Sequence, residues 1–204
     1  MAETEEKKSR FIAYVRPVES EEEAFAFIAE IRKRHWDASH HCSAFIIGEN
    51  NEIMRANDDG EPAQTAGRPM LDVLLSEDVH NACVVVTRYF GGTLLGTGGL
   101  VRAYGGAAKE GLKNSVIVEK SLADRLEIKT DYSDLGKIQY IAGEADIAVL
   151  KSNYSDTVSM TLLVPVAISE TFMQKLTEAT SGRCEMILKD KVYYGLVGKE
   201  IQLF

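Results

Sequence analysis

Apolar residues in the first half of the chain occur in short runs and at helical spacing, and each spacing predicts an element. Short apolar runs bounded by polar residues predict four strands, at residues 11–15, 42–47, 52–56 and 82–86. The run at 82–86 is uniformly apolar. We therefore expect this strand to lie inside a sheet that is covered on both faces.

Three segments repeat apolar residues every three or four positions, the period of a helix with one buried side: residues 24–31, 70–74 and 100–112. Ser20 and Glu23, just before the first segment, form a capping box. The third segment contains Gly105, Gly106 and Gly111, and each glycine costs about 1 kcal/mol relative to alanine inside a helix. We expect close packing of this helix on the sheet to offset that cost.

The spacing changes after about Lys120. The second half predicts strands at 122–129, 148–151, 158–166 and 186–194, and helices from near Ser133 and over 170–180. The resulting order, β-α-β-β-α-β, is typical of a ferredoxin-like sandwich. The sequence thus predicts an α+β protein with two domains, residues 1–120 and 121–204.

Composition narrows the classes of function. The chain has 204 residues and a formal net charge of −8, so nucleic-acid binding would need a local basic patch. No apolar run approaches the roughly 20 residues that span a bilayer, and the polar residues 1–10 are not a signal peptide. Cys42, Cys83 and Cys184 form no C-x-x-C pair, which favours free thiols in a reducing compartment. We expect a cytoplasmic protein that does not enter a membrane.

The most distinctive stretch, residues 87–100, follows the apolar strand at 82–86 and leads into a helix. It holds five glycines within nine residues, which favours positive φ or close approach of another molecule. Gly91 and Gly96 have the spacing of a phosphate-binding P-loop, but Thr97 and Gly98 stand where Lys-Ser/Thr should follow. Two interpretations remain: a tight strand-to-helix corner, or a corner that also binds an anion through backbone N–H groups.

Several motifs accompany this stretch in a fixed order. They are Ser9-Arg10-Phe11-Ile12-Ala13, His40-His41-Cys42, Asp58-Asp59-Gly60-Glu61-Pro62, Thr65-Ala66-Gly67, Arg88-Tyr89-Phe90-Gly91-Gly92 and Gly98-Gly99-Leu100-Val101-Arg102-Ala103-Tyr104. Together they resemble the YigZ/IMPACT family over the whole first half of the chain. The second half resembles the extra domain of the bacterial members. One departure is Gln64, where the family more often has glycine.

The resemblance implies a fold and a field of action. The N-terminal domain would be similar to the second domain of small-subunit ribosomal protein five and to domain four of elongation factor G. The C-terminal domain would be similar to the last, ferredoxin-like domain of that factor. Eukaryotic relatives regulate translation under amino-acid stress by competing for a ribosome-associated activator of a kinase. That partner does not carry over to a chain of the bacterial type, but RNA, the ribosome or a translation-associated protein can be proposed as a partner.

If the motifs converge in space, they form one binding site. Its candidate residues are Arg10, His40, Asp58, Asp59, Glu61, Thr65, Arg88, Tyr89, Gly91, Gly92, Gly98, Gly99, Arg102 and Tyr104. Arg88 and Arg102 offer planar donor groups suited to phosphate, and Tyr89 could stack on a base. The alternative is an internal network in which both arginines pair with the nearby acids.

Other residues have two interpretations each. Tyr104 belongs to the apolar stripe of its helix and is expected in the core. His40 is expected to form a structural hydrogen bond rather than to catalyse, and His41 should face the opposite side of the strand. The three acids Asp58, Asp59 and Glu61 could bind Mg²⁺, but a turn that uses Asp and Gly for backbone reasons is favoured.

Two functions follow. The first is a non-enzymatic binding protein, a regulator of translation or stress that engages RNA, the ribosome or a translation component through a groove lined by glycine and arginine. It needs no catalytic residue, metal or cofactor. The alternative is a hydrolase-like enzyme acting on a phosphorylated or peptide-like small molecule. There the acids of residues 58–61 would hold a metal ion and His40 would move a proton.

Overall fold

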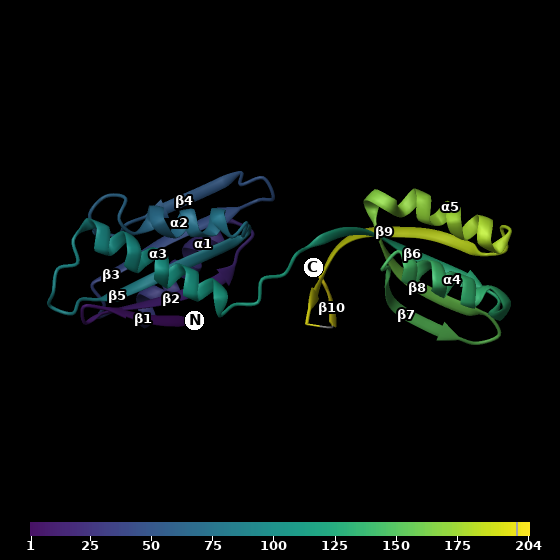
Figure 1. The fold of residues 1–204 in the computed structure, drawn as a ribbon, viewed down its shortest axis with the longest axis horizontal. Helices are drawn as coiled ribbons and strands as arrows, with labels where there is room; N and C mark the ends of the chain where they lie inside the picture. Colours follow the sequence, from purple (N-terminus) through teal and green to yellow (C-terminus); the bar gives the residue numbers. More distant parts are fainter. Residues whose placement is uncertain (199) are drawn as a thin grey trace. The chain divides into compact units, whose positions relative to one another are not determined.

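The chain divides into two units, Met1–Ile117 and Val118–Phe204 (Figure 1). The structure is a computed structural model and describes residues 1–198 and 200–204. Each unit is an antiparallel sheet with helices packed on it, so the α+β class is confirmed. The boundary between the units falls between Ile117 and Val118. No helix in the described residues is long and apolar enough to cross a bilayer.

Unit 1 contains a five-stranded sheet in the order β1-β2-β5-β3-β4, with every neighbouring pair antiparallel. The strands are β1 (Ala2–Glu6), β2 (Ser9–Pro17), β3 (His40–Ile47), β4 (Ile53–Asn57) and β5 (Ala82–Tyr89). β5 is the central strand, and its residues 82–88 are all buried. The expectation of an internal strand covered on both faces is therefore confirmed.

Helices cover both faces of this sheet, and the alternation of side chains along β5 divides the core into two layers. α1 (Glu21–Arg34) packs on one face, where Cys83 and Val85 join its core. α2 (Gly67–Ser76) and α3 (Thr97–Lys113) pack on the other face, over Val84 and Val86. At the start of α1, the Ser20 hydroxyl accepts a hydrogen bond from the Glu23 amide, as the capping motif predicts.

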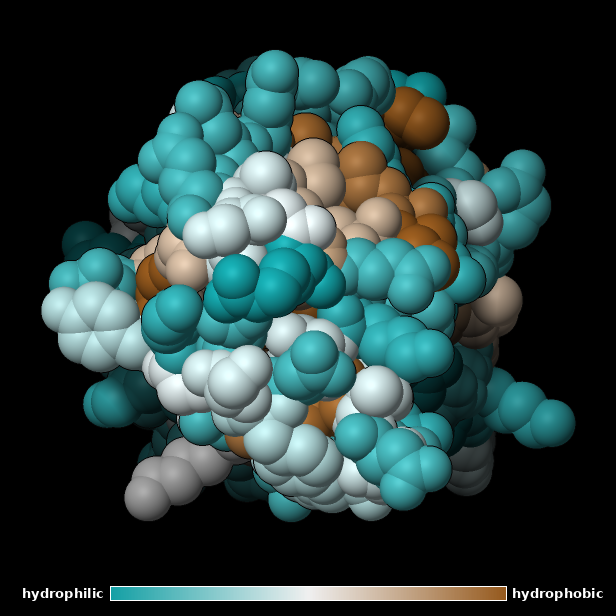
Figure 2. Space-filling view, turned by 90° about the vertical axis from the view of Figure 1, so that its right-hand side faces the viewer, coloured by the Kyte–Doolittle hydropathy of each residue, from teal (hydrophilic) through white to brown (hydrophobic). Residues whose placement is uncertain are grey.

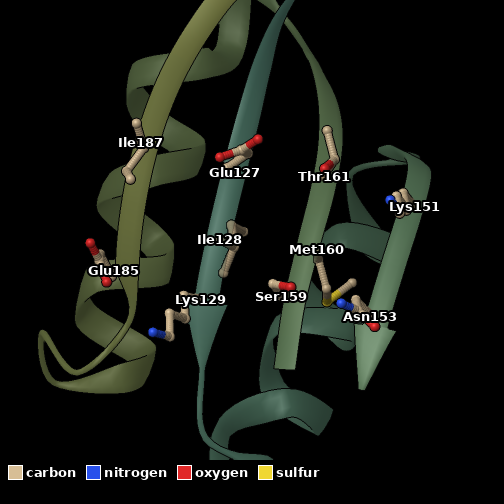
Figure 3. A pocket seen from close by; sticks show the side chains of 10 residues that line it. All are labelled: Glu127, Ile128, Lys129, Lys151, Asn153, Ser159, Met160, Thr161, Glu185 and Ile187. Atoms are coloured by element: carbon tan, nitrogen blue, oxygen red, sulfur yellow. The ribbon is translucent and has the colours of Figure 1, made fainter. Parts of the chain in front are cut away.

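Unit 2 has the predicted element order β-α-β-β-α-β. Its elements are β6 (Ser121–Thr130), α4 (Tyr132–Glu144), β7 (Ala148–Tyr154), β8 (Val158–Pro165), the 3-10 turn η1 (Val166–Ile168), α5 (Ser169–Thr180), β9 (Glu185–Val197) and β10 (Glu200–Leu203). The sheet order is β10-β9-β6-β8-β7. α4 and α5 share one apolar core on one face of the sheet, and Figure 3 shows both helices behind the strands. Figure 2 shows one side of this unit, where hydrophilic side chains surround hydrophobic patches.

Two strands, β1 and β10, were not predicted from the sequence. Both lie at the edge of a sheet, and the final predicted strand is followed by β10 rather than ending the chain. In β1 only Ala2 is buried, and β10 has no buried residue. An edge strand is held mainly by backbone hydrogen bonds on one side, so its side chains need not alternate between apolar and polar.

The glycines of α3 differ in what they do. A Cβ on Gly111 would lie 3.0 Å from the Cβ of Ala13 and 3.2 Å from Cγ2 of Val15 on β2. A Cβ on Gly106 would meet nothing within 4 Å. The expected close packing on the sheet is thus confirmed for Gly111 and is wrong for Gly106, which faces open space.

This contrast gives a matched pair of substitutions in one helix. We expect Gly106→Ala to raise the free energy of unfolding by about 1 kcal/mol, because alanine favours the helix and meets no neighbour. We expect Gly111→Ala to lower it by about 1–3 kcal/mol, because the added methyl group overpacks the contact with β2. Urea unfolding followed by circular dichroism measures both. Equal shifts in the two variants would contradict this account.

Candidate functional site

The loop between β4 and α2 is organised by Asp58. Its carboxylate accepts hydrogen bonds from the backbone N–H groups of Gln64 (2.7 Å), Ala66 (2.9 Å) and Gly67 (2.8 Å). These bonds close the loop and satisfy amide donors at the start of α2 that have no partner within the helix. Thr65 is buried and donates its hydroxyl to the Pro62 carbonyl at 2.6 Å. The interpretation of this segment as a backbone-directed turn is confirmed.

The three acids of the loop do not converge. Asp59 pairs with Arg32 at 2.6 Å and accepts a hydrogen bond from the His41 amide at 2.7 Å. Asp58 faces the loop amides, and Glu61 points into the core. Within the described residues, no group of three His, Cys, Asp or Glu side chains could hold a metal ion. The metal site of the hydrolase alternative is therefore not formed by these carboxylates.

Arg88 is not in an open groove. Its Nη1 donates to Oε1 of Glu61 at 2.6 Å, and its Nη2 donates to the Ser9 hydroxyl at 3.3 Å. The Tyr104 hydroxyl donates to the same Glu61 oxygen at 2.7 Å. The side chains of Arg88 and Glu61 are only 6% and 4% exposed. The expectation of a phosphate-binding Arg88 is wrong, and the internal ion-pair network is correct for this arginine.

The position of Arg88 on β5 explains its burial. It lies on the same side of the strand as Val84 and Val86, and therefore faces α2 and α3. Its guanidinium lies 5.5 Å from the ring centres of Phe11 and Phe90, and its Nε is buried without a hydrogen-bond partner. The prediction that Arg88 binds phosphate was based on its guanidinium group alone. It left out the side of the strand from which this side chain projects.

Two groups beside this pair stay protonated at neutral pH. Burial raises the pKa of the Tyr104 hydroxyl, in agreement with its expected place in the core. Burial also raises the pKa of the Cys42 thiol, whose Sγ donates to the Asp58 carbonyl at 3.0 Å. A nucleophilic cysteine needs a lowered pKa, so Cys42 is a structural thiol.

His40 and His41 face opposite sides of β3, as expected. His40 Nδ1 lies 2.8 Å from the Asp59 carbonyl oxygen, which can only accept, so Nδ1 carries a proton. Its Nε2 lies 3.9 Å from Oε1 of Glu61. The ring of His41 is buried on the α1 side, where its Nδ1 is 3.2 Å from the Thr87 hydroxyl. His40 thus forms the structural hydrogen bond that the sequence favours.

Tyr89 and Arg10 belong to the α1 face and not to the face of Arg88. The Tyr89 hydroxyl lies 2.9 Å from His35 Nδ1 and donates to Asp37 at 3.1 Å. Arg10 lies over the Tyr89 ring and pairs with Glu3 at 2.9 Å. The expectation of one site that gathers all the motifs is therefore wrong. Adjacent residues of a strand point to opposite faces, and this rule separates Tyr89 from its neighbour in the chain.

The glycine stretch is first of all a corner of the backbone. A Cβ on Gly91 would collide with the backbone of Lys8 and Ser9, and the Gly91 amide donates to the Ser9 hydroxyl at 3.1 Å. Gly92 and Gly96 have positive φ values of 80° and 72°. Both conformations favour glycine, so the tight-corner interpretation is correct for the first part of the stretch.

The start of α3 keeps the features of an anion site. The helix begins at Thr97, and no side chain caps it. Leu100 is the first residue whose amide bonds back, to the Gly96 carbonyl at 3.0 Å, so the N–H groups of Thr97, Gly98 and Gly99 have no partner within the helix. Thr97 and Gly98 are exposed, and Gly99 is half-buried.

Arg102 lies along this first turn. Its Nη1 is 3.7 Å from the position that a Cβ of Gly98 would occupy, and the side chain is exposed. In the part of the chain that the structure describes, no hydrogen bond or ion pair involves Arg102. One guanidinium and three amide donors therefore remain accessible at the α3 start, whereas the second predicted guanidinium is buried.

Lys7 and Lys8 also belong to this region, and the sequence reasoning did not find them. They form the turn between β1 and β2, with φ values of 45° and 68°, and the backbone of Lys8 packs against Gly91. Both side chains are exposed. The turn could not be predicted without β1, because the side chains of β1 do not alternate between buried and exposed positions. A pair of lysines between two polar segments was the only signal in the sequence.

Comparison with known proteins places the motifs in a family. Residues 7–112 match the Impact N-terminal domain, and residues 128–183 match a domain of unknown function, DUF1949. The chain is 44% identical over 180 residues to IMPACT family member YvyE of Bacillus subtilis, covering 88% of this chain and 83% of that protein. It is 37% identical over 183 residues to IMPACT family member YigZ of Escherichia coli, covering 89% and 90%.

Two further comparisons support the same family assignment. A protein IMPACT homolog of Saccharomyces cerevisiae is 36% identical over 96 residues, which cover 45% of this chain and 36% of the yeast protein. A crystal structure described as that of a hypothetical protein is similar over 93% of each chain, with 35% identity and a TM-score of 0.57. The family resemblance stated from the motifs is confirmed.

The buried ion pair leads to a stability prediction. We expect Glu61→Gln to lower the free energy of unfolding by about 3–5 kcal/mol, because Arg88 would stay buried without a counter-charge. The double variant Glu61→Gln with Arg88→Met should lose clearly less than the sum of the two single losses. Urea unfolding of all four proteins tests this. Additivity within about 0.5 kcal/mol would contradict a coupled pair.

Two histidines lead to a pH prediction. Burial, and then the charge of Arg32, lower the pKa of His41, and burial followed by Arg34 lowers that of His35. Below the ordinary histidine pKa of about 6.5 the unfolded chain binds protons that the folded chain resists. Stability contributed by the neutral rings is therefore complete above that pH and is lost as the pH falls towards 5.

The measurement is the free energy of unfolding between pH 7.5 and pH 5, in about half-unit steps. The combined variant His35→Gln with His41→Gln should show a flatter dependence than the unaltered chain. Both proteins contain the same Asp and Glu residues, so titration of carboxylates contributes to both curves and does not imitate the difference between them. An identical slope in both proteins would refute the assignment.

Proposed function

The chain belongs to the IMPACT family, and on this premise we propose that it is a non-enzymatic binding protein that engages RNA, the ribosome or another translation component. The contact would be made at the corner between β5 and α3. Its chemical groups are Arg102, the three amide donors of residues 97–99 and the exposed Lys7–Lys8 turn. These groups would bind phosphate.

The single observation that supports this proposal most strongly is the unpaired, exposed Arg102 beside an uncapped helix start. Amide donors at a helix N-terminus and the helix dipole both favour an anion. A guanidinium forms charge-assisted, bidentate hydrogen bonds with phosphate. Each of the other nine arginines in the described residues forms an ion pair, so Arg102 stands out among them.

The family relation supports the translation context. The motifs resemble those of eukaryotic relatives that regulate translation, and the same resemblance implies an N-terminal domain like the second domain of small-subunit ribosomal protein five. The β-α-β-β-α-β order of unit 2 is compatible with a domain like the last domain of elongation factor G.

Among the residues that the structure describes, no contact favours the hydrolase alternative. The acids of the loop are engaged with backbone amides, Arg32 and Arg88, and the thiol of Cys42 is held protonated by burial. His40 forms a hydrogen bond to a backbone carbonyl. These groups explain the conformation of the loop without a reaction.

The proposal predicts a defined loss on removing Arg102. Arg102→Gln should weaken binding of the full chain to RNA oligonucleotides by about tenfold, and it should reduce the slope of log affinity against log salt by about 1, because one phosphate contact disappears. Fluorescence anisotropy over a range of salt concentrations measures both quantities.

Lys113→Gln is the matched control, since it removes one positive charge from the other end of the same helix. It should leave affinity and salt dependence nearly unchanged. Arg88 is not a suitable control because it is buried against Glu61, and its removal would lower the stability of unit 1. If Arg102→Gln binds like the unaltered chain, or if the control loses as much affinity, the α3 start is not the contact.

A further inference from the structure

The turn after α1 exposes the only tryptophan in the sequence, Trp36, whose side chain is 83% accessible. Tryptophan is usually well buried in folded proteins, and exposed aromatic residues are typical of binding surfaces. Among the described residues, no hydrogen bond or ring contact involves Trp36. Most of its large π surface is therefore exposed to solvent.

The residues on either side of Trp36 are fixed by a chain of hydrogen bonds. Tyr89 donates to Asp37 at 3.1 Å, so His35 Nδ1, at 2.9 Å from the Tyr89 oxygen, is the donor of that contact, and His35 Nε2 lies 2.7 Å from the Tyr14 hydroxyl. Burial lowers the pKa of His35, and the neutral ring accepts a hydrogen bond from Tyr14 at Nε2. The residues on both sides of Trp36 are thus anchored, and the ring is presented by a pre-organised turn.

Basic side chains precede this ring in the last turn of α1. They are Arg32, Lys33 and Arg34. Arg32 and Arg34 pair with acids, but their side chains are still 54% and 52% exposed. Lys33 forms no ion pair within the described part of the chain. An exposed aromatic ring beside cationic side chains is the combination that binds the bases and phosphates of a single strand.

The turn lies at the same end of the unit 1 sheet as the proposed phosphate contact. The amide of Ser39, which follows the turn, donates to the Arg88 carbonyl at 2.9 Å, and Arg88 leads directly into the glycine stretch. The segment that carries Trp36 and the segment that leads to Arg102 are therefore linked by a hydrogen bond. A ligand with several regularly spaced phosphates could contact both.

We propose that Trp36 is a base-stacking platform and that the ligand of this end of unit 1 is single-stranded RNA. The inference rests on the proposed function and specifies its ligand class. Bases inside a duplex are already stacked on each other, whereas an unpaired base offers a free face to an aromatic side chain. Exposed Trp and Arg residues also occur in protein interfaces, but the free amides and guanidinium at the α3 start favour phosphate.

The single tryptophan allows a direct test, because all tryptophan fluorescence of the full chain comes from Trp36. Titration with a short oligouridylate should quench this fluorescence, and a duplex of equal length should quench it far less. Trp36→Leu should weaken single-strand binding by about tenfold, and Trp36→Phe should retain most of the affinity. Tyr140→Leu, which removes another exposed aromatic ring, is the control and should have no effect.

The results separate this inference from the proposed function. If Trp36→Leu binds RNA normally while Arg102→Gln does not, the stacking platform is refuted and the phosphate contact stands. If single strand and duplex quench equally, single-strand recognition is refuted. If the unaltered chain binds no RNA, and a nuclease-treated translation protein protects Trp36 instead, the stacking platform and the phosphate contact are both refuted, and only engagement of a translation component stands. Circular dichroism of each variant confirms that the fold is retained.

Discussion

The buried ion pair between Arg88 and Glu61 joins segments of unit 1 that lie far apart in the sequence. It joins β5 to the loop before α2, and Tyr104 adds α3 through the same carboxylate oxygen. Ser9 adds β2, since its hydroxyl accepts from both Arg88 and the amide of Gly91. A buried charge is costly unless it is paired, so these four segments can pack only if both partners are in place.

This pair also explains why the corner after β5 has its shape. Arg88 is directed inward, and Gly91, three residues later, packs against the backbone of the β1–β2 turn. The motifs around Arg88, Glu61 and Tyr104 are therefore structural in the first place. The residues left for recognition are those that the internal network does not use: the uncapped start of α3, Arg102, the lysine turn and the tryptophan turn.

Unit 2 contrasts with this end of unit 1. Its sheet has helices on one side only, and the residues lining the hollow on the open side are Glu127, Ile128, Lys129, Lys151, Asn153, Ser159, Met160, Thr161, Glu185 and Ile187 (Figure 3). None of them is aromatic. Positive and negative side chains are mixed, and Glu127 pairs with Lys189 at 3.0 Å. Such a surface offers no stacking platform, so base recognition is better supported in unit 1.

Spacing along the chain was sufficient for most of the architecture. The apolar run of β5, the capped start of α1 and the β-α-β-β-α-β order of unit 2 are local patterns, and local patterns are set by burial of one face and by capping groups. The linked motifs were also sufficient for the family. The edge strands β1 and β10 were not predicted, because they are held by pairing of the backbone rather than by burial of side chains.

The candidate site could not be read in the same way. Whether Arg88 meets phosphate or Glu61 depends on the side of β5 from which it projects and on where a loop 27 residues earlier in the chain places its carboxylate. Tyr89, one residue later, faces α1 instead. The sequence identifies the charged groups. Three-dimensional packing determines which of these charges are neutralised inside the protein and which stay accessible to a partner, because pairing depends on distance in space and not on separation along the chain.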